Sequence, residues 1–265
     1  MDTMMSLWVG PRLGTIERLS ISSYLANGHP FDLYAYGPIA GVPAGATVRD
    51  ANEVLPEGDI KKFKHFANFS DLWRYTMLFE KGGWWVDLDT VCLRPFGFKE
   101  ERILSAETDE LMARHAGSRF YINASTMRMP KGDPMMEWLV RQVRQMDWQK
   151  MEWAAAGPII VTKAVMEFKL PFMPPVVFNP IRAKDYIKLV GVPCLQVPKG
   201  AYAIHFYHSM WVLWGKQKLN PDATYPRECL YEQLKRRFSV ASNPGPRRWQ
   251  EGWREREAAR LSAAA

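Results

Sequence analysis

The sequence predicts an α/β domain, in which short apolar strands alternate with helices. Residues 4–9 form a short apolar stretch, residues 17–25 predict a helix that stops at Asn27-Gly28, and residues 31–36 alternate as a strand does. A hydrophobic content of 47% is ample for the core of such a domain. The third observation is the stretch 70–95, in which a helix, a stop and a strand follow one another.

Within this stretch, apolar residues recur with helical spacing, at Leu72, Tyr75, Leu78 and Phe79. Ser70 is the expected N-cap of the helix, with Asn68 as the alternative. Gly82-Gly83 ends the helix, because glycine accepts the left-handed conformation that a C-cap needs. Trp84-Trp85-Val86 then predicts a buried strand of large β-forming residues.

Two aspartates follow this strand at once, Asp87 and Asp89. Ionised carboxylates in a site that excludes water cost several kcal/mol unless they are paired or bind a cation. Strand alternation puts both side chains on the same side of the chain. Hard oxygen ligands suit Mn²⁺ or Mg²⁺, so the pair predicts a divalent metal site. The simpler alternative is a turn after a strand, where aspartate is common.

The spacing S-D-x-x-R-Y-x-x-L-x-x-x-G-G-x-W-x-D-x-D, from Ser70 to Asp89, resembles the signature of nucleotide-sugar glycosyltransferases with the GT-A fold. The stretch is most similar to the DXD-containing sugar-binding family of yeast-type mannosyltransferases and bacterial capsule and lipopolysaccharide transferases. The clostridial toxin glucosyltransferases are more distant relatives. A lone D-x-D is a weak signal, but here it belongs to a strong set, Asp71, Arg74, Gly82, Gly83, Asp87 and Asp89.

The resemblance implies a Rossmann-like mixed sheet flanked by helices over residues 1–215, followed by a helical extension and basic tail at 216–265. It implies that Asp89 coordinates the metal and that Asp87 contacts the ribose or sugar and helps the metal shell. Asp71 and Arg74, at i and i+3 on one helix face, would hold the donor sugar. An exposed ion pair is the alternative for these two residues, but the apolar neighbours indicate a largely buried helix.

Other donor contacts are also implied by the resemblance. Trp8 would lie against the nucleotide base, with Val9 and Trp85 in the same donor site; core packing is the alternative for Trp8. Asn123 would lie beside the donor sugar or the acceptor. The alternative for Asn123, a buried asparagine with satisfied hydrogen bonds, stays equally open.

A second informative stretch, 203–211, contains two histidines. In the resembling family a late histidine completes the metal shell; His205 is the better positional match and His208 the second choice. Ser209 and Trp211 would then lie over the diphosphate. Neutral imidazole is a competent Mn²⁺ ligand, although a histidine beside aromatic residues is more often part of a core.

The remaining elements are predicted from pattern. We expect residues 91–93 to continue the sheet and 61–69 to be a solvated helix face. Further strands are expected at 103–106, 119–127, 176–178 and 194–197, and helices at 135–146, from about Gly157-Pro158, and at 226–238.

Net charge and cysteine usage limit the possible partners and the cellular compartment. The formal net charge is +7, and much of the excess lies late, at Lys235, Arg236, Arg237, Arg247, Arg248, Arg254, Arg256 and Arg260. This basic tail could contact an anionic membrane surface or a nucleic acid; no pattern of a nucleic-acid-binding module is present, and no obligate protein partner is inferred. Three widely spaced cysteines, and no signal peptide or membrane-spanning run, predict a cytoplasmic protein, with a peripheral membrane location as the alternative.

The resemblance therefore implies a metal-dependent transferase. It would move a sugar, with retention, from a nucleotide-diphosphate sugar, most plausibly a UDP-sugar, to the hydroxyl of a glycan, a lipid-linked or another acceptor. Two alternatives stay open. One is a transferase that acts on a macromolecule such as modified DNA or a protein, and the other is a nucleotide-sugar-binding protein that has lost turnover.

Overall fold

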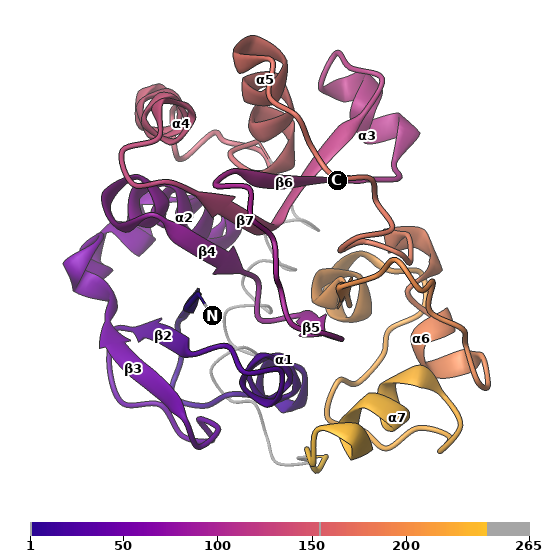
Figure 1. The fold of residues 1–265 in the computed structure, drawn as a ribbon. Coiled ribbons are helices and arrows are strands. Elements are labelled where there is room, and N and C mark those ends of the chain that lie inside the picture. Colours follow the sequence, from indigo (N-terminus) through magenta and orange to yellow (C-terminus); the bar gives the residue numbers. More distant parts are fainter. Residues whose placement is uncertain (1, 154, 243–265) are drawn as a thin grey trace.

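The computed structural model describes residues 2–153 and 155–242. Its main sheet has six strands in the order β3-β2-β1-β4-β7-β6 (Figure 1). Strands β1 (Met4–Trp8), β2 (Phe31–Ala35), β3 (Ala46–Asp50) and β4 (Gly83–Val86) pair in parallel, whereas β7 (Tyr121–Met129) runs antiparallel to both β4 and β6 (Ile103–Glu107). The predicted α/β class with a mixed sheet is confirmed.

Helices cover both faces of this sheet. Side chains alternate along a strand, so Met5 of β1 joins a core with α2 (Phe66–Lys81), α4 (Pro134–Gln145) and α5 (Pro158–Phe168). Met4, its neighbour, joins a second core that includes residues of α1 (Thr15–Ala26), on the other face. Two short helices, α3 (Glu110–His115) and α6 (Lys188–Gly191), lie at the periphery (Figure 1).

The helix that carries the motif is α2, and it begins earlier than predicted. His65 is its N-cap and makes no capping bond with its side chain, so the prediction of Ser70 or Asn68 as the cap is wrong. The stretch 61–69 is not a solvated face either, because Phe63 and Phe69 are buried. The end is as predicted: Gly82 has φ 68°, and a Cβ there would lie 2.5 Å from the Lys131 main-chain nitrogen.

After β4 the chain leaves the main sheet. Strand β5 (Thr90–Cys92) pairs antiparallel with β8 (Ala203–His205) in a separate two-stranded sheet, so the expectation that 91–93 continues the main sheet is wrong. The cause is a turn over residues 87–90 that redirects the chain. The new pairing sets Thr90 opposite His205, and so joins the two informative stretches of the sequence.

Two other predicted strands are absent from the described chain. Residues 176–178 form turns, in which the Val177 and Asn179 amides donate to the carbonyls of Pro174 and Pro175. Residues 194–197 are also irregular, since Cys194 has φ 50°. Proline removes donors that a sheet ladder needs, which explains the first case. The strands at 103–106 and 119–127 and the helices near 135–146 and from Pro158 are confirmed.

The C-terminal helix α7 (Leu230–Arg237) packs against the rest of the protein. Leu230 and Leu234 share a core with Ile16 of α1 and Ile204 of β8. The predicted boundary at residue 215 stays a prediction. Lys235 is buried and pairs with Glu232 at 2.5 Å, so it is not part of an exposed basic surface.

Arg236 and Arg237 are exposed, and the later basic residues, from Arg247 onward, lie outside the described residues. Across 2–153 and 155–242, no helix is both long enough and apolar enough to cross a bilayer.

Candidate active site

The Asp-x-Asp motif forms a tight turn at the end of β4. The Thr90 amide and hydroxyl both donate to the Asp87 carbonyl oxygen, at 3.0 and 2.7 Å. The motif is therefore both a turn and a candidate site, two interpretations that the sequence set against each other. The carboxylates do lie on one side, but through this turn rather than through strand alternation.

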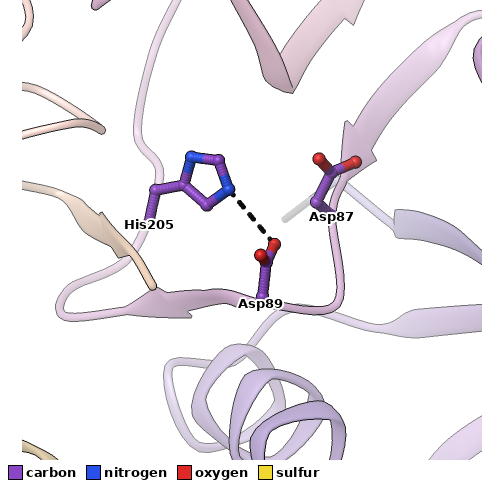
Figure 2. A group of neighbouring side chains, drawn as sticks. All are labelled: Asp87, Asp89 and His205. Atoms are coloured by element: carbon purple, nitrogen blue, oxygen red, sulfur yellow. Dashed lines mark ion pairs between the residues drawn. The ribbon is translucent and has the colours of Figure 1, made fainter. Parts of the chain in front are cut away.

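Three side chains converge beside this turn. Asp87, Asp89 and His205 each offer one ligand atom, and these atoms lie within 4.8 Å of one another. Figure 2 shows the carboxylates and the imidazole facing one space, with His205 Nε2 3.3 Å from Asp89 Oδ1. The pairing of β5 with β8 delivers the histidine to this position.

The second candidate histidine has a different place. His208 Nδ1 lies 3.3 Å from Glu17 Oε1 of helix α1, and its main-chain amide donates to Asp89 Oδ2 at 2.8 Å. It thus helps to position Asp89 through its backbone. The geometry favours His205 over His208 as the third ligand.

Electrostatics distinguish the two carboxylates. Burial raises the pKa of Asp89, but His205 and the His208 amide outweigh it and bring the value to about 2. Burial, with the nearby Asp89 charge, raises the pKa of Asp87 despite the opposing effect of Arg74. Burial lowers the pKa of His205, yet Asp89, Asp87 and Glu107 reverse this and leave it raised.

This donor set fits a divalent cation. Two carboxylates and an imidazole are the oxygen and nitrogen ligands that Mn²⁺ accepts, and carboxylates suit Mg²⁺ as well. The concentrated negative charge already favours a proton on His205, and a metal ion would replace that proton.

A buried arginine connects the metal group to helix α2. Arg74 Nη2 donates to Asp87 Oδ1 at 2.9 Å, and its Nη1 donates to the Ala124 carbonyl at 2.6 Å and lies 3.4 Å from Asp71 Oδ1. Trp85 supports the same carboxylate, since its Nε1 donates to Asp87 Oδ1 at 2.6 Å. Asp71 and Arg74 are each only 6% exposed, which excludes the surface ion pair.

Asp71 sits in a tight and dry position. Burial raises its pKa to about 7, although the charge of Arg74 opposes this. A Cβ on Gly157 would lie 2.9 Å from Asp71 Oδ2, so the residue before α5 has to be small for this carboxylate to keep its place.

The remaining residues that were predicted to bind the donor differ in their burial and in their contacts with the metal group. Trp8 is partly buried at the end of β1, next to the buried Val9. Asn123 is buried; its Nδ2 donates to Glu107 Oε2 at 2.5 Å and lies 3.5 Å from His205 Nδ1. Its hydrogen bonds are largely satisfied, as the simpler interpretation expects, but it lies directly beside the candidate ligand.

Ser209 and Trp211 complete the predicted set. Ser209 is half-buried and directly precedes a short π-helix, Met210–Trp214. Trp211 is fully buried and packs against Phe206 and Tyr231. Its side chain is core, so we withdraw the expectation that it lies over a diphosphate.

Sequence reasoning missed two buried acids. Glu107, at the end of β6, holds Asn123, and burial raises its pKa. Glu17 lies in α1 and faces His208. Glu107 follows the predicted strand 103–106 by one residue, so an acidic residue at a strand end was a usable signal. No sequence signal pointed to Glu17, because its partner His208 is distant in sequence.

A surface cavity of about 450 Å³ lies elsewhere, between the β5–β8 pair and α7. Leu93, Arg94, Leu234 and Arg237 are among its lining residues. None of the residues of the metal group lines it, so this cavity is separate from the candidate site.

The match to a family model agrees with this location. Residues 43–111 match the family model "Glycosyltransferase sugar-binding region containing DXD motif", and this segment includes Asp71, Arg74, Asp87 and Asp89. A solved structure, PaToxG glycosyltransferase, aligns with a TM-score of 0.48 and 15% identity, over 63% of this chain and 69% of that one. No curated protein matches the sequence. The family match confirms the resemblance seen in the motif.

Proposed function

Since residues 43–111 carry a glycosyltransferase sugar-binding region with the DXD motif, we propose that the protein is a metal-dependent glycosyltransferase. Its donor is a nucleotide-diphosphate sugar, most simply a UDP-sugar, and its acceptor is a hydroxyl group. The observation that carries this proposal is the meeting of Asp87, Asp89 and His205, with ligand atoms within 4.8 Å of one another.

Asp89, Asp87 and His205 would hold a Mn²⁺ or Mg²⁺ ion. Such an ion supplies Lewis-acid stabilisation of the charge on a leaving diphosphate. This metal site is preorganised, because the His208 amide orients Asp89 and the Arg74 and Trp85 side chains orient Asp87 through hydrogen bonds.

Asp71 would orient the sugar, and Arg74 would hold Asp71 and Asp87 in place. Arg74 is committed to Asp87 and the Ala124 carbonyl, so its main task is to hold the site together. The Asp71 carboxylate has the free acceptor capacity to bind sugar hydroxyls, and its fixed position favours one sugar orientation.

The transfer itself needs no nucleophile from the chain. In a same-face reaction the acceptor oxygen bonds to the anomeric carbon as the bond to the phosphate oxygen breaks. The departing phosphate accepts the acceptor proton, and the anomeric configuration is retained. Two carboxylates in the manner of glycoside hydrolases are not available, because Asp87 and Asp89 are committed to the metal group.

The alternatives differ in turnover and in acceptor. A binding protein without turnover would keep the donor site, and the complete set Asp71, Arg74, Asp87 and Asp89 counts against it. A macromolecular acceptor, a cytoplasmic location and a peripheral contact with a membrane or nucleic acid remain proposals. The macromolecular acceptor and the peripheral contact depend largely on the basic residues after 242, outside the described chain, whereas the cytoplasmic location depends on the cysteine usage.

Hydrolysis of a panel of UDP- and GDP-sugars without acceptor tests the proposal. We expect Mn²⁺-dependent release of the nucleotide from one donor, loss of release with EDTA, and loss in Asp89→Ala. Asp147→Ala is the control, because that aspartate lies on the surface with its side chain 52% exposed. No release from any donor, together with no Mn²⁺-dependent nucleotide binding, would overturn the catalytic proposal.

A further inference from the structure

Two exposed indoles meet on the surface. Trp153 is 41% exposed and Trp214 is 38% exposed, although most large apolar side chains of the described chain are buried. Their ring centroids lie 5.6 Å apart with the planes tilted by 52°. Exposed apolar groups that gather in one place commonly mark a binding surface.

Trp153 belongs to a segment that follows the site face of α2. Asn68 Nδ2 donates to the Glu152 carbonyl at 3.1 Å, and the Tyr75 hydroxyl donates to the Ala156 carbonyl at 2.7 Å. Between these two anchors, on the same helix, lies Asp71, against which Gly157 packs. Trp153 is therefore carried by the segment that packs against the proposed sugar-binding carboxylate.

Trp214 belongs to a different segment, the one that holds Asp89. It ends the π-helix Met210–Trp214, which begins two residues after His208, whose amide fixes Asp89. The buried Trp211 anchors the same helix in the core. The ring contact thus joins the segment that packs against Asp71 to the segment that holds Asp89.

We propose that Trp153 and Trp214 form the binding platform for the acceptor, and that this acceptor is a saccharide. The inference rests on the proposed transferase function. Asp71 and His205 of the proposed donor site are buried, whereas the two rings are exposed and are carried by the segments that hold Asp71 and Asp89, which leaves the rings for the second substrate.

The chemistry of the pair fits a sugar ring. A pyranose has apolar C–H faces and hydroxyl edges, and an indole offers a flat apolar face with one polar N–H at its edge. Ligand sites combine such aromatic surfaces with a few polar groups that fix orientation. Two tilted rings can hold a sugar against one face while its hydroxyl edge points toward the donor.

The test measures the KM for donor and acceptor separately, after wild-type hydrolysis has identified the donor. The probes are methyl pyranosides, a short peptide panel and a polyprenyl phosphate. We expect transfer to a pyranoside. The KM for the pyranoside should rise roughly tenfold in Trp153→Ala and in Trp214→Ala. Trp153→Phe and Trp214→Phe should stay close to the wild type, because they keep an aromatic face. Val48→Ala is the control, because Val48 is also exposed but lies on strand β3.

Three results would overturn the platform. Transfer only to the peptides or the polyprenyl phosphate would exclude a saccharide acceptor. An unchanged KM for the pyranoside in both alanine variants would exclude the pair. Equal increases in the KM for donor and acceptor would show that the ring contact only holds together the two segments that carry Trp153 and Trp214. Failure of the transferase function is recognised separately, because the wild type would then release no nucleotide from any donor.

Discussion

The buried Arg74 and the partly exposed Asp87 form a charged hydrogen bond, with Nη2 and Oδ1 2.9 Å apart. The sequence pairs Arg74 with Asp71, one turn away on the same helix, but that contact is longer, at 3.4 Å. The closer contact spans 13 residues and joins helix α2 to the turn that carries the metal group. The proposed sugar-binding and metal-binding residues are therefore one connected network.

This network predicts a large loss of stability in Arg74→Ala. The variant would leave the buried Asp71 and the partly buried Asp87 without their cation, and loss of one partner of a buried pair costs about 3–5 kcal/mol in the free energy of unfolding. Urea denaturation measures this value. The matched control is Arg49→Ala, whose surface pair with Asp32 is half exposed and worth about 0–1 kcal/mol. Similar losses in the two variants would contradict a structural role for Arg74.

Alanine variants of His205 and His208 should differ in their affinity for Mn²⁺. We expect His205→Ala to weaken Mn²⁺ binding at least roughly tenfold, because it removes a ligand. His208→Ala should have a smaller effect, because the contact of His208 with Asp89 is made by its main-chain amide. Calorimetric titration of both variants with Mn²⁺ measures the difference, and a larger effect at His208 would reverse the assignment.

The raised pKa of Asp71 predicts a pH-dependent stability. Its value is about 7 in the folded protein and about 3.9 in an unfolded chain. Between these values the folded state binds more protons, so this residue lowers the free energy of unfolding as the pH rises from about 4 to about 7. Above that window its contribution is constant.

Asp71→Asn removes this titration. The stability of the variant relative to the wild type should therefore rise between pH 5 and pH 8, as measured by urea denaturation at both values. A difference between the two proteins that does not change with pH would show that Asp71 does not titrate in this range.

Gly157→Ala tests whether the close packing of Gly157 against the Asp71 carboxylate matters for donor binding. The added Cβ would lie 2.9 Å from Asp71 Oδ2, so the carboxylate must shift. We expect a higher KM for the donor in acceptor-free hydrolysis. Gly58→Ala is the control, because a Cβ there meets nothing within 4 Å. An unchanged donor KM in Gly157→Ala would mean that the position of Asp71 does not matter for the donor.

The sequence was sufficient where the signal is local. The helix, its glycine end and the strand before Asp87 follow from spacing and from residue types in one stretch, and the structure confirms them. The side-by-side placement of Asp87 and Asp89 also follows, although the turn that produces it was the rejected alternative.

Contacts that depend on the fold could not be predicted in this way. The Asp222 carboxylate accepts bonds from the Thr15 amide and hydroxyl across 207 residues, and so caps helix α1 from the far end of the chain. Glu107 reaches Asn123 only because β6 and β7 pair. Trp153 and Trp214 likewise gave no joint signal, since nothing local relates a residue in an irregular segment to one at the end of a distant π-helix.

The most direct test of the account is anomalous diffraction from crystals grown with Mn²⁺ and UDP. The account predicts one manganese peak, bounded by Asp87, Asp89 and His205, which disappears in Asp89→Ala. A peak at another place, or no peak at a Mn²⁺ concentration that supports nucleotide binding, would contradict the claim that these three residues form the metal site.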